Sequence, residues 1–136
     1  MKRTVRSNTG EVTVRETGLI YARAFLNTNI NLDEAKAYHA MVEHLSKRQP
    51  HCTVIDISGV KSISTEARKF LQETSSEWNK TLAVALVTTS FTSKMIGRFF
   101  LTVNRPSYPV KIFTDLREAN SWARNEYGKA MTRIAS

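Results

Sequence analysis

Two short and almost wholly apolar runs, at residues 52–57 and 82–87, most constrain what this chain can fold into. Their aliphatic and β-branched side chains do not alternate with polar ones, a pattern typical of parallel strands that are covered on both faces. Parallel neighbours need a crossover connection, which is usually a helix. Because a helical pattern occupies residues 64–79 between the two runs, the sequence predicts a β-α-β unit.

The residues before this unit predict an antiparallel hairpin and a helix. Residues 11–15 and 19–25 alternate between apolar and polar side chains on either side of a short joint that contains Gly18. Asn31 is expected to begin the helix, because Glu34 three positions later completes a capping box.

The remaining elements complete an alternating order of strands and helices. They are an edge strand or a frayed end at residues 1–9, a helix at about 90–103, a short strand at 110–113, and a last helix from about 115 whose tail at 129–136 is either helical or frayed. This order predicts one α/β domain over residues 1–136, with a mixed sheet, an N-terminal antiparallel hairpin, parallel central strands and about four helices.

Composition limits the classes of function. No apolar run approaches the roughly 18 residues that a membrane-spanning helix needs. Cys52 is the only cysteine, so we expect a cytoplasmic protein in which this thiol has a buried, apolar role. The formal net charge of +8 is spread along the chain without interleaved aromatic residues, which does not favour nucleic acid as a partner. His39 and His44 lack metal spacing and no acid–base pair assembles, so no metal, cofactor or enzymatic activity is predicted.

The loop after the first apolar run carries the clearest functional signal. Ser58 and Gly59 end the strand, and a second short run leads to a helix start at Ser64 and Thr65. Hydroxyl groups therefore lie beside the positive end of a helix dipole, where phosphate is favoured. Two interpretations stay open at this point. In the structural one, Asp56 accepts backbone hydrogen bonds in the turn and Ser64 caps the helix; in the functional one, the loop binds a partner.

The residues of this loop are Val54-Ile55-Asp56-Ile57-Ser58-Gly59-Val60-Lys61-Ser62-Ile63-Ser64-Thr65. They resemble the signature of the STAS domains, the anti-sigma-factor antagonists and their relatives, in which Asp-Leu-Ser-Gly-Val, an apolar residue and then Asp-Ser-Ser-Gly lead into a helix. A closer resemblance is to uncharacterised bacterial proteins with a SpoIIAA-like fold. Those proteins have sequences similar in kind to Met95-Ile96-Gly97-Arg98-Phe99-Phe100-Leu101. They also have a segment similar to Phe113-Thr114-Asp115 before a helix that contains Ala and Trp.

The resemblance implies a STAS-like fold and a non-enzymatic regulatory module that binds a protein partner. Aligned on the family pattern, Ser64 takes the aspartate position and Thr65 takes that of the phosphoacceptor serine. Glu66 replaces the second serine and Ala67 replaces the glycine, which changes the charge and the backbone freedom of the loop. The expected partner surface, with Thr65 as its candidate phosphoacceptor, comprises Asp56, Ser58, Ser62, Ser64, Thr65, Glu66 and Arg68.

The helix expected before residue 103 suggests a second class of function. Its apolar residues fill two neighbouring helical columns, and basic residues lie on the other side. The alternative function is therefore binding of an apolar or lipid-like anionic ligand by Met95, Arg98, Phe99 and Phe100. Simple packing on the sheet is another interpretation of the same face, and a homodimer through this helix or an edge strand also stays open.

Overall fold

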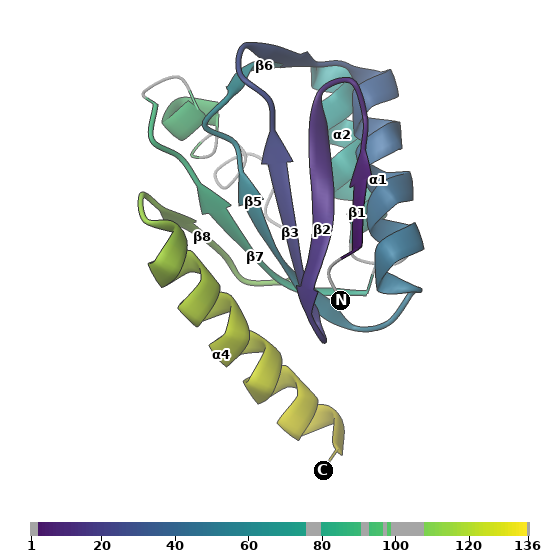
Figure 1. Ribbon diagram of the computed structural model, residues 1–136, viewed down its shortest axis with the longest axis vertical. Coiled ribbons are helices and arrows are strands. Elements are labelled where there is room, and N and C mark those ends of the chain that lie inside the picture. The colour runs from purple at the N-terminus through teal and green to yellow at the C-terminus, as the bar shows by residue number, and fades with distance from the viewer. Residues whose placement is uncertain (1–2, 76–79, 91–92, 97, 99–107, 136) are drawn as a thin grey trace.

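A mixed sheet with helices on both faces forms the fold (Figure 1). The computed structural model describes residues 3–75, 80–90, 93–96, 98 and 108–135. Within these residues the main sheet has six strands in the order β1-β2-β3-β5-β7-β8. Their bounds are β1 Arg3–Arg6, β2 Gly10–Glu16, β3 Leu19–Ala24, β5 His51–Asp56, β7 Thr81–Val87 and β8 Val110–Phe113. This is the α/β architecture that the sequence predicted.

Strand direction changes across the sheet as expected. β1 pairs with β2, and β2 with β3, in antiparallel register, so the first strand is an edge strand beside the predicted hairpin. β3, β5, β7 and β8 then pair in parallel. All these parallel strands therefore end at the same edge of the sheet, which is the edge where Asp56 lies.

The helices begin and end where local signals place them. In α1 (Leu32–Ser46) the Asn31 N–H donates to Glu34 Oε1 at 2.8 Å, which confirms the capping box. α2 spans Thr65–Ser75, and residues 76–79 of its expected range lie outside the described residues. α4 (Leu116–Ala135) continues through most of the stretch for which a frayed tail was one expectation.

α4 covers one face of the sheet, as Figure 1 shows, chiefly over β5 and β7. The buried residues of this layer are Leu19, Tyr21, Cys52, Val54, Ala83, Ala85, Val87, Phe113, Ala119 and Ala123. Burial raises the pKa of the Cys52 thiol to about 12, so the thiol stays protonated at neutral pH. This confirms the buried, apolar role expected for the cysteine.

α1 and α2 lie on the opposite face, with α1 to the right of the strands in Figure 1 and α2 partly behind β1 and β2. The buried residues between α1 and the sheet are Val12, Ile20, Ala22, Met41, Val42 and Leu45. α2 packs mainly against α1 rather than against the sheet. One such contact is the edge-to-face pair of the His39 and Phe70 rings, whose centroids are 5.6 Å apart.

A second, two-stranded sheet lies at the end of the molecule that carries the candidate loop. β4 (Thr28–Ile30) pairs in parallel with β6 (Val60–Ile63). The Thr28 N–H donates to the Gly59 carbonyl at 3.0 Å, which joins the two strands at their start. The short run after Gly59 is therefore a strand, and its partner β4 was not predicted.

His51, at the start of β5, makes the stability of this fold depend on pH. Its side chain is 1% exposed and its Nδ1–H donates to the Gln49 carbonyl at 2.8 Å, while Nε2 finds no hydrogen-bond partner among the described residues. Burial lowers the pKa of His51 below its ordinary value of 6.5, because the charged ring would lose its hydration. The unfolded chain therefore binds this proton more readily than the native protein does.

We expect the contribution of His51 to stability to be complete above about pH 6.5 and to be lost as the pH falls below that value. The urea midpoint of the wild type should fall between about pH 7.5 and about pH 5.5. The urea midpoint of His44→Gln, which changes an exposed histidine, should fall by the same amount as that of the wild type. The midpoint of His51→Gln should fall much less. An equal fall in all three proteins would contradict this role of His51.

Candidate interaction site

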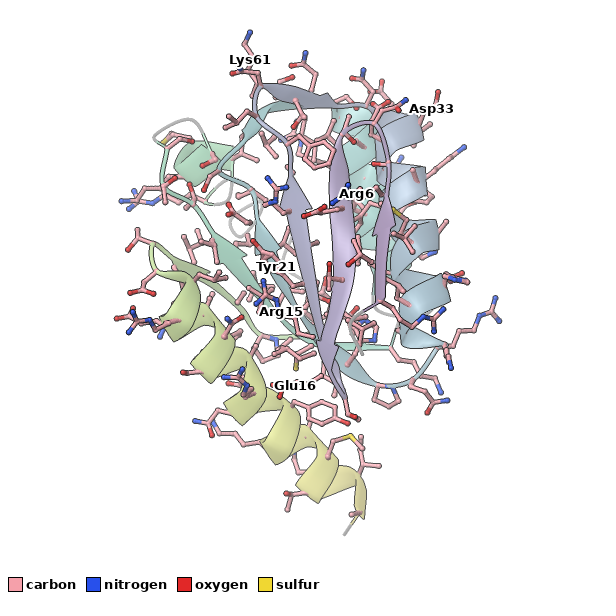
Figure 2. All side chains as sticks on the ribbon, viewed as in Figure 1. Arg6, Arg15, Glu16, Tyr21, Asp33 and Lys61 are labelled. Carbon is pink, nitrogen blue, oxygen red and sulfur yellow. The ribbon has the colours of Figure 1, made fainter. Side chains whose placement is uncertain are left out.

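Asp56 ends β5 and shapes the turn that follows. Its Oδ1 accepts a hydrogen bond from the Ser58 N–H at 2.9 Å, which confirms the structural interpretation of this carboxylate. The side chain is only partly buried. Burial and the negative charge of Asp56 together raise the pKa of Tyr21 on the neighbouring strand β3, while Arg15, whose guanidinium lies 4.2 Å from the centre of the Tyr21 ring, lowers it (Figure 2).

Ser58 and Gly59 fix this turn to its two neighbours. The Ser58 Oγ accepts a hydrogen bond from the Thr89 N–H at 3.0 Å, just beyond the end of β7. On the other side, Gly59 approaches the backbone of Phe25 so closely that a Cβ at this position would overlap the Phe25 carbonyl. The loop is thus held rigidly between β3 and β7.

β6 then presents an exposed polar edge. Ser62 donates from its Oγ to the Asn29 Oδ1 at 2.6 Å, and both side chains are exposed. Lys61 is also exposed and projects from this end of the molecule in Figure 2.

Ser64 is the N-cap of α2. Its Oγ accepts from the Ala67 N–H at 3.0 Å, and its own N–H donates to the Ile30 carbonyl at 2.9 Å. The hydroxyl is therefore committed to the helix, as the structural interpretation predicted. Ala67, at the position of the family glycine, is fully buried.

Thr65 is the first residue of α2 and stands exposed beside this cap. Arg68, one turn later and partly buried, donates from its Nη2 to the Thr65 Oγ1 at 3.4 Å. Glu66 is exposed in the same first turn. A threonine hydroxyl, a guanidinium and the positive end of a helix dipole therefore meet at the surface.

Leu26 is a neighbour of this loop that sequence reasoning missed. It lies in the turn between β3 and β4 and is 83% exposed, next to the Phe25 backbone against which Gly59 packs. The following Asn27 has φ 58°, a left-handed conformation that asparagine tolerates. The only sequence signal for an exposed Leu26 was its position before an asparagine in the turn that ends a strand.

The second set of expected residues is described only in part. Ser90 begins the short helical stretch 93–96, because its Oγ accepts from the Ser93 N–H at 3.1 Å. Met95 is 51% exposed and Arg98 is exposed. Phe99 and Phe100 lie outside the described residues, so the ligand site expected here stays a prediction.

Comparison with known proteins identifies the family. The family described as a domain of unknown function, DUF7793, matches residues 13–126. The chain belongs to this family. None of the curated proteins matches the DUF7793 chain significantly.

A solved structure has the fold that the sequence predicted. It is an uncharacterised protein of the DUF3478 family with a SpoIIAA-like fold, from Shewanella loihica PV-4. The two chains are 16% identical with a TM-score of 0.56, over 90% of this chain and 92% of that one. The DUF7793 chain is therefore similar in fold to a SpoIIAA-like protein, which confirms the expected STAS-like architecture. Among the described helices, none combines the length and apolar character needed to cross a membrane.

Proposed function

We propose that this protein is a non-enzymatic regulatory module that binds a protein partner through residues 56–68. The observation that carries this proposal is that Ser64 and Thr65 have different roles at the start of α2. Ser64 supplies the cap, so Thr65 is exposed and is not needed to begin the helix. The rigid turn at Ser58 and Gly59 holds this surface in one shape, which lowers the entropic cost of binding.

Phosphorylation of Thr65 is the proposed control of this surface. Phosphate would add up to about two negative charges at the helix N-terminus. Arg68 and the helix dipole stabilise that charge within the protein, so the fold tolerates the modification. In residues 56–68 the charges of Asp56 and Glu66 balance those of Lys61 and Arg68, so a phosphate would make this surface negative and an acidic partner would be repelled.

Thr65→Glu should abolish partner binding, whereas Thr65→Ala should keep it. We expect at least a tenfold, on the order of 1.4 kcal/mol, loss for the glutamate variant because like charges face each other across the interface. The measurement is a pull-down from extract of the source cells with each variant as bait, followed by titration of the recovered partner. Thr17→Glu is the matched control, since Thr17 is an exposed threonine in the turn at the opposite edge of the sheet.

The outcomes separate the two interpretations of the loop. Loss of one protein with Thr65→Glu, but not with Thr65→Ala or Thr17→Glu, supports a regulated partner surface. Recovery of identical proteins by all the baits would mean that the loop serves only the fold.

A further inference from the structure

A cavity of about 180 Å³ lies between the sheet and the helices α1 and α2. Its lining comes from separate elements: Ile55 and Leu86 from the sheet, Tyr38 from α1 and Leu71 from α2. The cavity exists because α2 packs mainly on α1 and leaves space above β5 and β7.

The size and the lining of this space suit a small molecule. An engineered apolar cavity of roughly 150 Å³ stays dry and binds benzene, so a volume of this order admits an aromatic ring or a short aliphatic chain. Ile55, Leu71 and Ile96 line the cavity and are only partly buried. A ligand would cover apolar surface that the protein leaves accessible.

The charged groups on the lining argue against an anionic ligand. Glu11 is paired with Arg23 at 3.1 Å, and the Glu34 carboxylate accepts from the Asn31 N–H at the start of α1. These charged residues are already engaged within the protein. Arg23, the one cation of the described lining, is thus already paired, while Glu34 keeps its negative charge, so burying an anionic ligand there would be costly.

The remaining polar side chains of the described lining are four hydroxyl residues, Ser7, Thr9, Thr53 and Thr81, and two tyrosines. Tyr38 and Tyr108 both line the cavity. Burial, together with the neighbouring Tyr108 phenol, raises the pKa of Tyr38, so its hydroxyl is neutral at physiological pH. A neutral hydroxyl both donates and accepts hydrogen bonds, and it can therefore orient an alcohol or phenol group of a ligand.

We propose that this cavity binds a small uncharged apolar molecule with one hydroxyl group, of the size of a substituted phenol or a medium-chain alcohol. The hydroxyl of the ligand bonds to Tyr38, and its apolar body lies against Leu71 and Ile55. This differs in charge and in residues from the anionic ligand expected beside Met95. The cavity lining also includes Ile57, Val60 and Ile63 of the segment 56–68, so the cavity borders the inner side of the proposed partner surface. The ligand contacts proposed here, Tyr38, Ile55 and Leu71, lie outside that segment.

Ligand-detected NMR titration with p-cresol, toluene and benzoate tests the proposal on the full chain. The wild type should bind p-cresol saturably, toluene more weakly, and benzoate not measurably. Tyr38→Phe keeps the ring but removes the hydroxyl, so p-cresol binding should weaken about three- to tenfold while toluene binding stays unchanged. Tyr127→Phe, in the layer under α4, is the matched control and should leave the binding of both probes unchanged.

A volume-filling variant provides the second readout. Leu71→Trp should abolish binding of both probes, and a thermal melt shows whether that variant is folded. The absence of saturable binding to the wild type would overturn the proposal. Equal binding of benzoate, or unchanged p-cresol affinity in Tyr38→Phe, would overturn the assigned ligand class even if Leu71→Trp failed to fold. Neither result depends on what the Thr65 variants recover.

Discussion

Gly18→Ala should destabilise the protein by about 3 kcal/mol, the largest effect we expect from removing or adding a single methyl group. Gly18 has φ 77°, a left-handed conformation that alanine adopts only at a cost. A Cβ at this position would also overlap the ring of Tyr127 on α4. The glycine carbonyl accepts from the Cys52 N–H at 2.8 Å, so the turn cannot simply move away.

A double-mutant cycle in urea separates the two causes. In a Tyr127→Ala background the steric conflict is absent, and Gly18→Ala should then cost only about 1–2 kcal/mol from the backbone conformation. Gly128→Ala is the control, since a Cβ there meets nothing within 4 Å on an exposed turn of α4 and should stabilise the helix by roughly 0.5–1 kcal/mol. An equal cost of Gly18→Ala in both backgrounds would show that Tyr127 does not press on the turn.

Gly59→Ala should damage the candidate surface as well as the fold. The added Cβ would overlap the Phe25 carbonyl and approach the Ala24 carbonyl oxygen within 2.9 Å, and both are backbone atoms that cannot rotate aside. We expect a loss of about 1–3 kcal/mol in the free energy of unfolding, because overpacking of this kind forces the backbone to shift. The hydrogen bond from Thr28 to the Gly59 carbonyl should be lost with it.

Urea denaturation and amide hydrogen exchange together measure this effect. The Thr28 amide should exchange faster in Gly59→Ala, while the amides of β7 that pair with β5 should change only by the global loss of stability. Lys61→Ala, an exposed change on β6, should leave both measurements within about 0.5 kcal/mol of the wild type. Unchanged exchange at Thr28 would mean that Gly59 does not hold β4 against β6.

Short-range signals were sufficient to predict the elements that position the site. The capping box of α1, the Ser64 cap and the Asp56 turn each depend on residues no more than three positions apart. Such contacts can be predicted from neighbouring residues in the sequence, and all three occur in the structure. The hairpin and the parallel strands follow from periodicity in the same way.

Features that depend on distant residues were beyond sequence reasoning. β4 has three residues, Thr28–Ile30, too few for a strand pattern to be recognised, and it forms only because the Gly59 loop lies beside it. The steric conflict between a Cβ at position 18 and the Tyr127 ring involves two residues that are far apart in the sequence. The cavity depends on how α2 packs against α1, which the apolar stripes of the two helices do not reveal. The roles of residues 56–68 in partner binding stay a prediction.

Photo-crosslinking from position 61 tests the central claim most directly, because Lys61 lies exposed in the middle of the proposed surface. A photoreactive residue there should crosslink to the partner recovered by the wild-type bait, and the same residue at Thr17 should not. The crosslink should persist with Thr65→Ala and disappear with Thr65→Glu. Equal crosslinking from positions 61 and 17, or a crosslink unaffected by Thr65→Glu, would contradict the assignment of residues 56–68 as a regulated partner surface.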